Sequence, residues 1–164
     1  MDADSVDCIV EQWARERPGM PVDGIGVVAR ILRIAKLITD ERRRVLAELD
    51  IDGATLDLLA TLRRAGAPYR LAPAEIAQHC LVSGGAITQR VARAEDAGLV
   101  RTARSASGKR TVAVELTEHG HRVIEHDIEV LIRRERELVA GLSDEERCRL
   151  EELLRRLLGQ LCRD

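Results

Sequence analysis

The stretch from residue 73 to residue 116 constrains the fold more than any other part of this chain. Pro73 suits the first turn of a short helix, because proline lacks the amide hydrogen that a first turn leaves unused. After a brief turn, Ser83 is a good N-cap for a second helix, which Gly98 ends. Two strand-like stretches follow, residues 99–105 and 111–116. The second stretch alternates Val112, Val114 and Leu116 with Ala113 and Glu115, as a half-buried strand does.

The rest of the chain is predicted to be helical. One Trp, one Tyr and no Phe leave the core to Leu, Ile, Val and Ala, which fill close-packed helical layers well. Helices fit residues 4–16, 25–49, 53–66, 117–140 and 143–161, with a brief strand possible at 67–71. The predicted fold is therefore mainly α with a small β hairpin. A tight helix pair followed by a hairpin is the layout of a winged helix-turn-helix.

The chain is expected to form one structural domain with three regions. Residues 1–50 would supply N-terminal helices for dimerisation and a possible ligand pocket, residues 51–116 the winged helix-turn-helix, and residues 117–164 C-terminal dimerisation helices. The last helix carries an apolar stripe at three- and four-residue spacing: Leu142, Leu150, Leu153, Leu154, Leu157, Leu158 and Leu161. Such a stripe is either core or partner surface. We expect it to meet the N-terminal helices of a second copy, which makes a homodimer.

The distribution of charge is more informative than its sum. The net charge of -2 by itself argues against nucleic acid. Residues 61–110, however, hold nine basic and three acidic side chains, a balance of +6, which leaves -8 for the remainder. A basic middle between acidic ends is typical of a DNA-facing segment, although a solvated charged face has the same composition.

The second helix of the pair is the predicted DNA-reading helix. Ile87, Val91 and Ala94 fall on one face and are expected to pack inward, which turns the opposite face outward. Small residues at the helix start allow close approach to phosphates. Basic residues in the wing, which is the predicted hairpin of residues 99–116, suit a narrow minor groove. The expected DNA contacts are Ser83, Gly85, Thr88, Gln89 and Arg93 in the helix, and Arg104, Lys109 and Arg110 in the wing.

Other classes of function find little support. No phosphate-binding loop, nucleophile elbow or HExxH motif occurs, so we expect no enzyme, no catalytic residues and no cofactor. A metal site built from His119, His121 and His126 is disfavoured, because the first two point to different faces of a helix. There is no long apolar run and no signal peptide, so the protein is expected in the cytoplasm and not in a membrane.

Three segments resemble the multiple-antibiotic-resistance regulator (MarR) family. They are Leu71-Ala-Pro-Ala-Glu-Ile-Ala, Thr88-Gln-Arg-Val-Ala-Arg-Ala-Glu-Asp-Ala-Gly-Leu-Val, and Lys109-Arg-Thr-Val-Ala-Val-Glu-Leu-Thr-Glu-His-Gly. The resemblance covers nearly the whole chain, but Gly108 stands where the family usually has an Asp that braces the wing arginine, here Arg110. The resemblance implies a dimer that binds a pseudo-palindromic operator and represses transcription until a ligand releases it.

A narrower likeness is to the PecS and urate-responsive branch of that family. The ligand residues of this branch fall on Trp13, Asp57 and Arg90. A further ligand arginine of this branch falls near Thr102, and Arg101 is adjacent but on the other strand face. The implied effector is therefore a small urate-like, carboxylate or phenolic anion. An anion that attracts Arg90 and repels Asp57 would shift the DNA-reading helix.

Three alternatives stay open. Trp13 could be an interface anchor, with Asp57 and Arg90 a structural ion pair. The protein could be a redox-sensing regulator that uses Cys8, although Asp4 and Asp7 nearby disfavour the reactive thiolate. It could also be a helical protein-interaction module that does not bind DNA.

Overall fold

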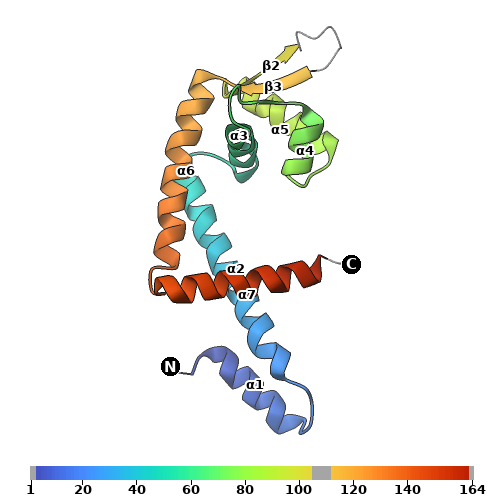
Figure 1. Ribbon diagram of the computed structural model, residues 1–164, viewed down its shortest axis with the longest axis vertical. Coiled ribbons are helices and arrows are strands. Elements are labelled where there is room, and N and C mark those ends of the chain that lie inside the picture. The colour runs from blue at the N-terminus through green and yellow to red at the C-terminus, as the bar shows by residue number, and fades with distance from the viewer. Residues whose placement is uncertain (1–2, 105–111, 163–164) are drawn as a thin grey trace. The chain divides into compact units, whose positions relative to one another are not determined.

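The computed structural model describes residues 3–104 and 112–162, which form two compact units, residues 1–48 and 49–164. In the first unit, α1 (Ser5–Glu16) packs against α2 (Asp23–Glu48) (Figure 1). Asp4 caps α1, since its carboxylate accepts the backbone amide of Val6 at 2.7 Å. Arg30 of α2 donates to Asp4 at 2.9 Å and to Asp7 at 2.7 Å, which ties the start of α1 to α2.

In the second unit, α3 (Gly53–Arg64) is the central helix. It contacts α4 (Pro73–His79), α5 (Gly84–Asp96) and α6 (Glu118–Leu138), and lies between α6 and the α4–α5 pair (Figure 1). Leu56, Leu58, Leu59 and Leu62 are each almost completely buried. A helix that is apolar on several sides must be surrounded by other elements, which explains why α3 holds the core together.

The N-cap residues and helix-ending glycines in the sequence predicted most helix ends correctly. Ser83, Thr117 and Ser143 cap α5, α6 and α7 (Asp144–Leu161), and each side chain accepts a backbone amide in the first turn. Gly66 and Gly98 adopt positive φ angles of 76° and 68° after α3 and α5, the conformation that favours glycine at a helix end.

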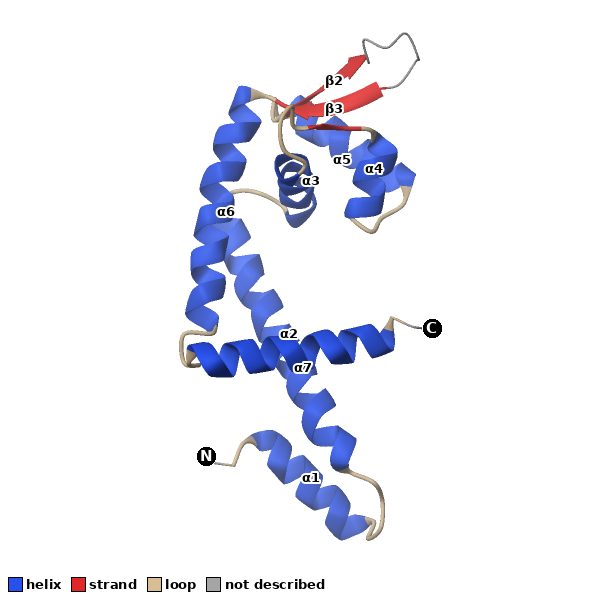
Figure 2. Cartoon of the chain, in the orientation of Figure 1, coloured by secondary structure: helices blue, strands red, loops and turns tan. Residues whose placement is uncertain are grey.

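The sheet has three antiparallel strands in the order β1-β3-β2 (Figure 2). They are β1 (Arg70–Leu71), β2 (Val100–Arg104) and β3 (Val112–Leu116). The predicted hairpin is present, and the brief strand before α4 joins it. The prediction that β3 buries only one face is wrong, because Ala113 and Glu115 are buried as well as Val114. As the middle strand, β3 is covered along both edges, and basic side chains from its neighbours cover Glu115.

The start of α6 packs closely against the two residues that precede β2. Thr117 Oγ1 donates to the Gly98 carbonyl at 2.7 Å. Gly120 packs so tightly that a Cβ atom there would lie 1.9 Å from the Leu99 carbonyl oxygen. Only glycine fits at this distance, so the contact sets the position of α6 against the sheet.

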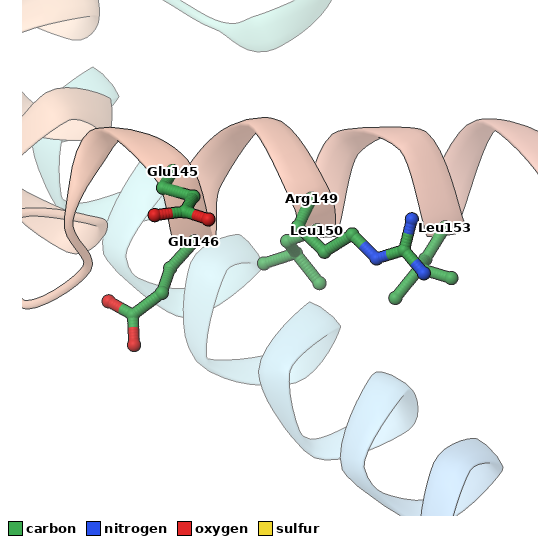
Figure 3. A pocket seen from close by; sticks show the side chains of 5 residues that line it. All are labelled: Glu145, Glu146, Arg149, Leu150 and Leu153. Carbon is green, nitrogen blue, oxygen red and sulfur yellow. The ribbon is translucent and has the colours of Figure 1, made fainter.

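The last helix, α7, has no buried residue. Its predicted leucine stripe is therefore not part of this chain's core, and Leu150, Leu153, Leu154, Leu158 and Leu161 are exposed. A hollow of about 350 Å³ on α7 is lined by Glu145, Glu146, Arg149, Leu150 and Leu153 (Figure 3). The stripe that the sequence predicts is thus an uncovered apolar face. No helix in the described part of the chain could span a bilayer.

Candidate nucleic-acid interface and ligand site

Helix α5 presents one apolar and one polar face, as the sequence predicts. Ile87, Val91 and Ala94 are buried against the core. The opposite face exposes Gly85, Thr88, Gln89, Ala92 and Arg93. A helix of 13 residues with an open polar face and a small-residue start has the dimensions and chemistry to enter a DNA major groove. Contact of these side chains with DNA stays a prediction.

Hydrogen bonds within α5 limit what two of these side chains can offer. Thr88 Oγ1 donates to the Gly84 carbonyl at 3.1 Å, so its hydroxyl hydrogen is occupied and its lone pairs and methyl group face outward. Ser83 Oγ accepts the amide of Ala86 at 3.4 Å, which leaves its hydrogen for an outside acceptor such as a phosphate. Ser83 and Thr88 therefore differ in what they can offer to a partner: Ser83 has a free hydroxyl hydrogen, whereas Thr88 has free lone pairs.

The predicted wing residues are only partly within the described structure. Arg104 is the last residue of β2. Lys109 and Arg110, and the Gly108 that departs from the family pattern, lie outside the described residues.

A carboxylate that the sequence analysis missed connects α5 to the wing. Glu95, in the last turn of α5, accepts both the backbone amide and the hydroxyl of Thr102 on β2, each at 2.9 Å. Thr102 is the position where the urate-responsive pattern would place a ligand arginine. In this chain the position serves to join the helix and the strand. A Glu three residues before the helix-ending Gly98 was visible in the sequence, but its partner depends on tertiary packing.

A second missed carboxylate binds two arginines across the sheet. Arg70, Glu115 and Arg101 lie in one row of the three strands, because Glu115 is the register partner of both arginines. Glu115 accepts Nε and Nη2 of Arg70 at 2.8 and 2.5 Å, and also pairs with Nε of Arg101. These contacts hold the pKa of Glu115 below its usual range: Arg70 contributes most, burial opposes it, and Arg101 adds to the lowering.

The predicted ligand residues lie in both units. Trp13 is partly exposed on α1, in the first unit. Asp57 is exposed on α3 and Arg90 half-buried on α5, in the second unit. Within the described structure, Nη1 of Arg90 is buried and has no hydrogen-bond partner. A buried guanidinium nitrogen without an acceptor is costly, so this atom is suited to binding an anion.

Among the described residues, the other reactive side chains form no second site. Cys8 is exposed, and its acidic neighbours Asp4 and Asp7 are bound to Arg30. The His121 ring packs edge-on against Tyr69, with 4.5 Å between centroids. Over the described ranges, no group of three His, Cys, Asp or Glu side chains could hold a metal ion.

Comparison with known proteins places the chain in a family. Residues 49–111 match the MarR family. The chain is 33% identical to the HTH-type transcriptional regulator PecS of Dickeya dadantii (strain 3937) over 152 residues, 93% of this chain and 92% of that protein. A MarR family protein of Bacillus stearothermophilus is similar in structure, with a TM-score of 0.71 and 27% identity over 88% of this chain and 100% of that chain.

A second similar structure contains DNA. It is the MarR family regulator Sco3205 of Streptomyces coelicolor in complex with DNA, with a TM-score of 0.71 and 26% identity, covering 82% of this chain and 85% of that chain.

Proposed function

Because this chain belongs to the MarR family of transcriptional regulators, we propose that it binds double-stranded DNA as a homodimer and represses transcription until a small effector releases it. It acts in the cytoplasm by binding and not by catalysis. The observation that carries this proposal is the open polar face of α5, capped by Ser83 and followed directly by the wing. The half-sites of its operator then lie about one helical turn of DNA apart.

The DNA-binding step is tested by fluorescence anisotropy with duplexes that cover the region upstream of the gene. We expect tight binding that weakens steeply as salt rises, because phosphate contacts release counterions. Arg93→Ala should weaken binding roughly tenfold or more. Arg133→Ala removes another exposed arginine, which lies on α6 and pairs with Glu129, and should leave binding unchanged. Dimers that show no specific, salt-sensitive binding would instead indicate a protein-interaction module.

Dimerisation is supported by the uncovered leucines of α7 and by the hollow on that helix, all of whose lining residues come from one helix (Figure 3). An apolar face of this kind is stable in water when a partner covers it. Leu154→Asp should shift the protein toward monomer in light scattering. Arg155→Asp places the same side chain at the next, strongly exposed position and should leave the dimer intact. A monomeric wild-type protein would contradict this part of the proposal.

The effector is proposed to be a small carboxylate or phenolic anion held by Arg90. The support is the buried Nη1 atom of Arg90 that lacks a hydrogen-bond partner. An anion there would be attracted by Arg90 and repelled by Asp57 on α3, and would draw α5 with it.

A thermal-shift screen of urate, tricarboxylates and phenolic acids tests this site. A bound effector raises the melting temperature of the wild type, because it binds the folded state only. Arg90→Ala should abolish the rise, whereas Arg93→Ala, exposed on the same helix, should retain it. An effector that stabilises wild type and Arg90→Ala equally would remove Arg90 from the site.

A further inference from the structure

The turn between α4 and α5 contains an exposed leucine on a strained backbone. Leu81 has a φ angle of 54°, in the left-handed region that a side chain with a Cβ adopts at a cost. Its side chain is 91% exposed, so packing against the core does not offset this cost. An exposed leucine also gains nothing from burial in this state. Leu81 is therefore unfavourable for the stability of the free protein on two counts.

The other two non-glycine residues with positive φ, among those the structure describes, have local reasons for it. Asp50 belongs to a residue type that tolerates this conformation. The Tyr69 ring packs edge-on against His121, and the guanidinium of Arg63 lies 5.0 Å from its centre. The backbone of Leu81 closes the end of α4, because the amides of Leu81 and Val82 donate to the carbonyls of Gln78 and Ala77 at 3.3 and 3.1 Å; glycine is the residue that adopts this conformation at least cost. A leucine at a helix end where glycine would fit at lower cost, with its side chain in water, points to a role in binding.

The surroundings of Leu81 indicate what it binds. It lines a shallow hollow with Ala77, Gln78, Val82 and Ser83, and two positions later Ser83 caps the proposed DNA-reading helix. The segment from residue 61 to residue 110 carries an excess of six positive charges. A leucine at the entrance of a helix into a groove can contact thymine methyl groups and deoxyribose carbons, which are the apolar surfaces of DNA.

We propose that Leu81 is a DNA-contacting residue that favours thymine at the edge of the major groove occupied by α5. This inference rests on the proposed function, because it requires α5 to be the DNA-reading helix. It adds an apolar, sequence-discriminating contact to a surface that is otherwise polar and basic.

The test uses the full-length protein and a duplex selected by the wild type from randomised DNA. Leu81→Gly removes the side chain and relieves the backbone. Leu81→Asn keeps a side chain of similar size that tolerates positive φ but is polar. Both variants should melt at or above the wild-type temperature, yet bind the selected duplex about three- to tenfold more weakly. Asp50→Gly, which relieves the backbone at a site outside α4 and α5, should leave affinity unchanged.

A second arm replaces each thymine of the duplex by deoxyuridine, which lacks only the methyl group. The wild type should lose affinity at one or two thymines per half-site, and Leu81→Gly should be insensitive at the same positions. Equal affinity and equal uridine sensitivity for wild type and Leu81→Gly would overturn the inference and leave the proposed function standing. A wild type that selects no DNA sequence would overturn both.

Discussion

Glu115 offers a measurable link between the sheet and the stability of the protein. Its side chain is 7% exposed, whereas those of Arg70 and Arg101 are 40% and 69% exposed. Glu115→Gln keeps the shape and removes the negative charge, so two ion pairs become weaker hydrogen bonds from arginine to a neutral amide oxygen. A hydrogen bond to a charged group contributes about 1.5–3 kcal/mol. The released arginines reach water, so we expect a loss of about 1–3 kcal/mol and no more.

The assay is chemical and thermal unfolding of Glu115→Gln beside the wild type. At pH 7 the melting temperature should fall by roughly 2–12 °C, given about 2–4 °C per kcal/mol for a chain of this size. The matched control is Glu129→Gln on α6, whose exposed pair with Arg133 should contribute less than about 0.5 kcal/mol.

The pH dependence distinguishes the charge from the shape of Glu115. Its pKa is lowered in the folded state, chiefly by Arg70, so its stabilisation is complete above the ordinary glutamate pKa of about 4.3. The stabilisation is lost as the pH falls through the lower folded-state pKa. The deficit of Glu115→Gln should therefore shrink on acidification below about pH 4. A variant as stable as the wild type at pH 7, or a deficit that stays constant with pH, would refute this reasoning.

Three further substitutions test other parts of the fold by thermal unfolding. Gly120→Ala should cost about 3 kcal/mol or more, because the new Cβ would meet the Leu99 carbonyl oxygen at 1.9 Å; a normal melting temperature would contradict that contact. Gly159→Ala, in α7 with open space around it, should stabilise by about 0.5–1 kcal/mol through helix propensity, and a loss of stability would argue against it. Burial raises the pKa of Asp127 and leaves Oδ2 without a partner among the described residues, so its ionised form destabilises the folded state above that raised pKa. Asp127→Asn should therefore gain about 1 kcal/mol at pH 7, and the gain should vanish below about pH 4; a gain that persists in acid would show that charge is not the cause.

The sequence predicted the features that depend on neighbours along the chain. Ser83, Thr117 and Ser143 cap their helices because an N-cap needs only its own first turn. The inward and outward faces of α5 likewise follow from helical spacing, which Ile87 and Arg93 illustrate.

What the sequence did not predict depends on partners far apart in the chain. The strand Arg70–Leu71 is only two residues long, so its pairing with β3 leaves no periodic signal. The burial of Glu115 follows from that pairing, because the middle strand has neighbours on both edges. The Glu95–Thr102 contact likewise needs α5 and β2 to be in place before the two residues can meet.

The contact between Glu95 and Thr102 also bears on how the protein leaves DNA. Arg90, which we propose to hold the effector, belongs to the same helix as Glu95. Glu95 accepts hydrogen bonds from both the backbone amide and the hydroxyl of Thr102 on β2. A tilt of α5 would therefore move β2, and the wing with it, through these two hydrogen bonds. We expect major-groove and minor-groove protection to disappear at the same effector concentration in footprinting. Glu95→Gln should loosen that transmission, so that the two grooves are vacated at different concentrations.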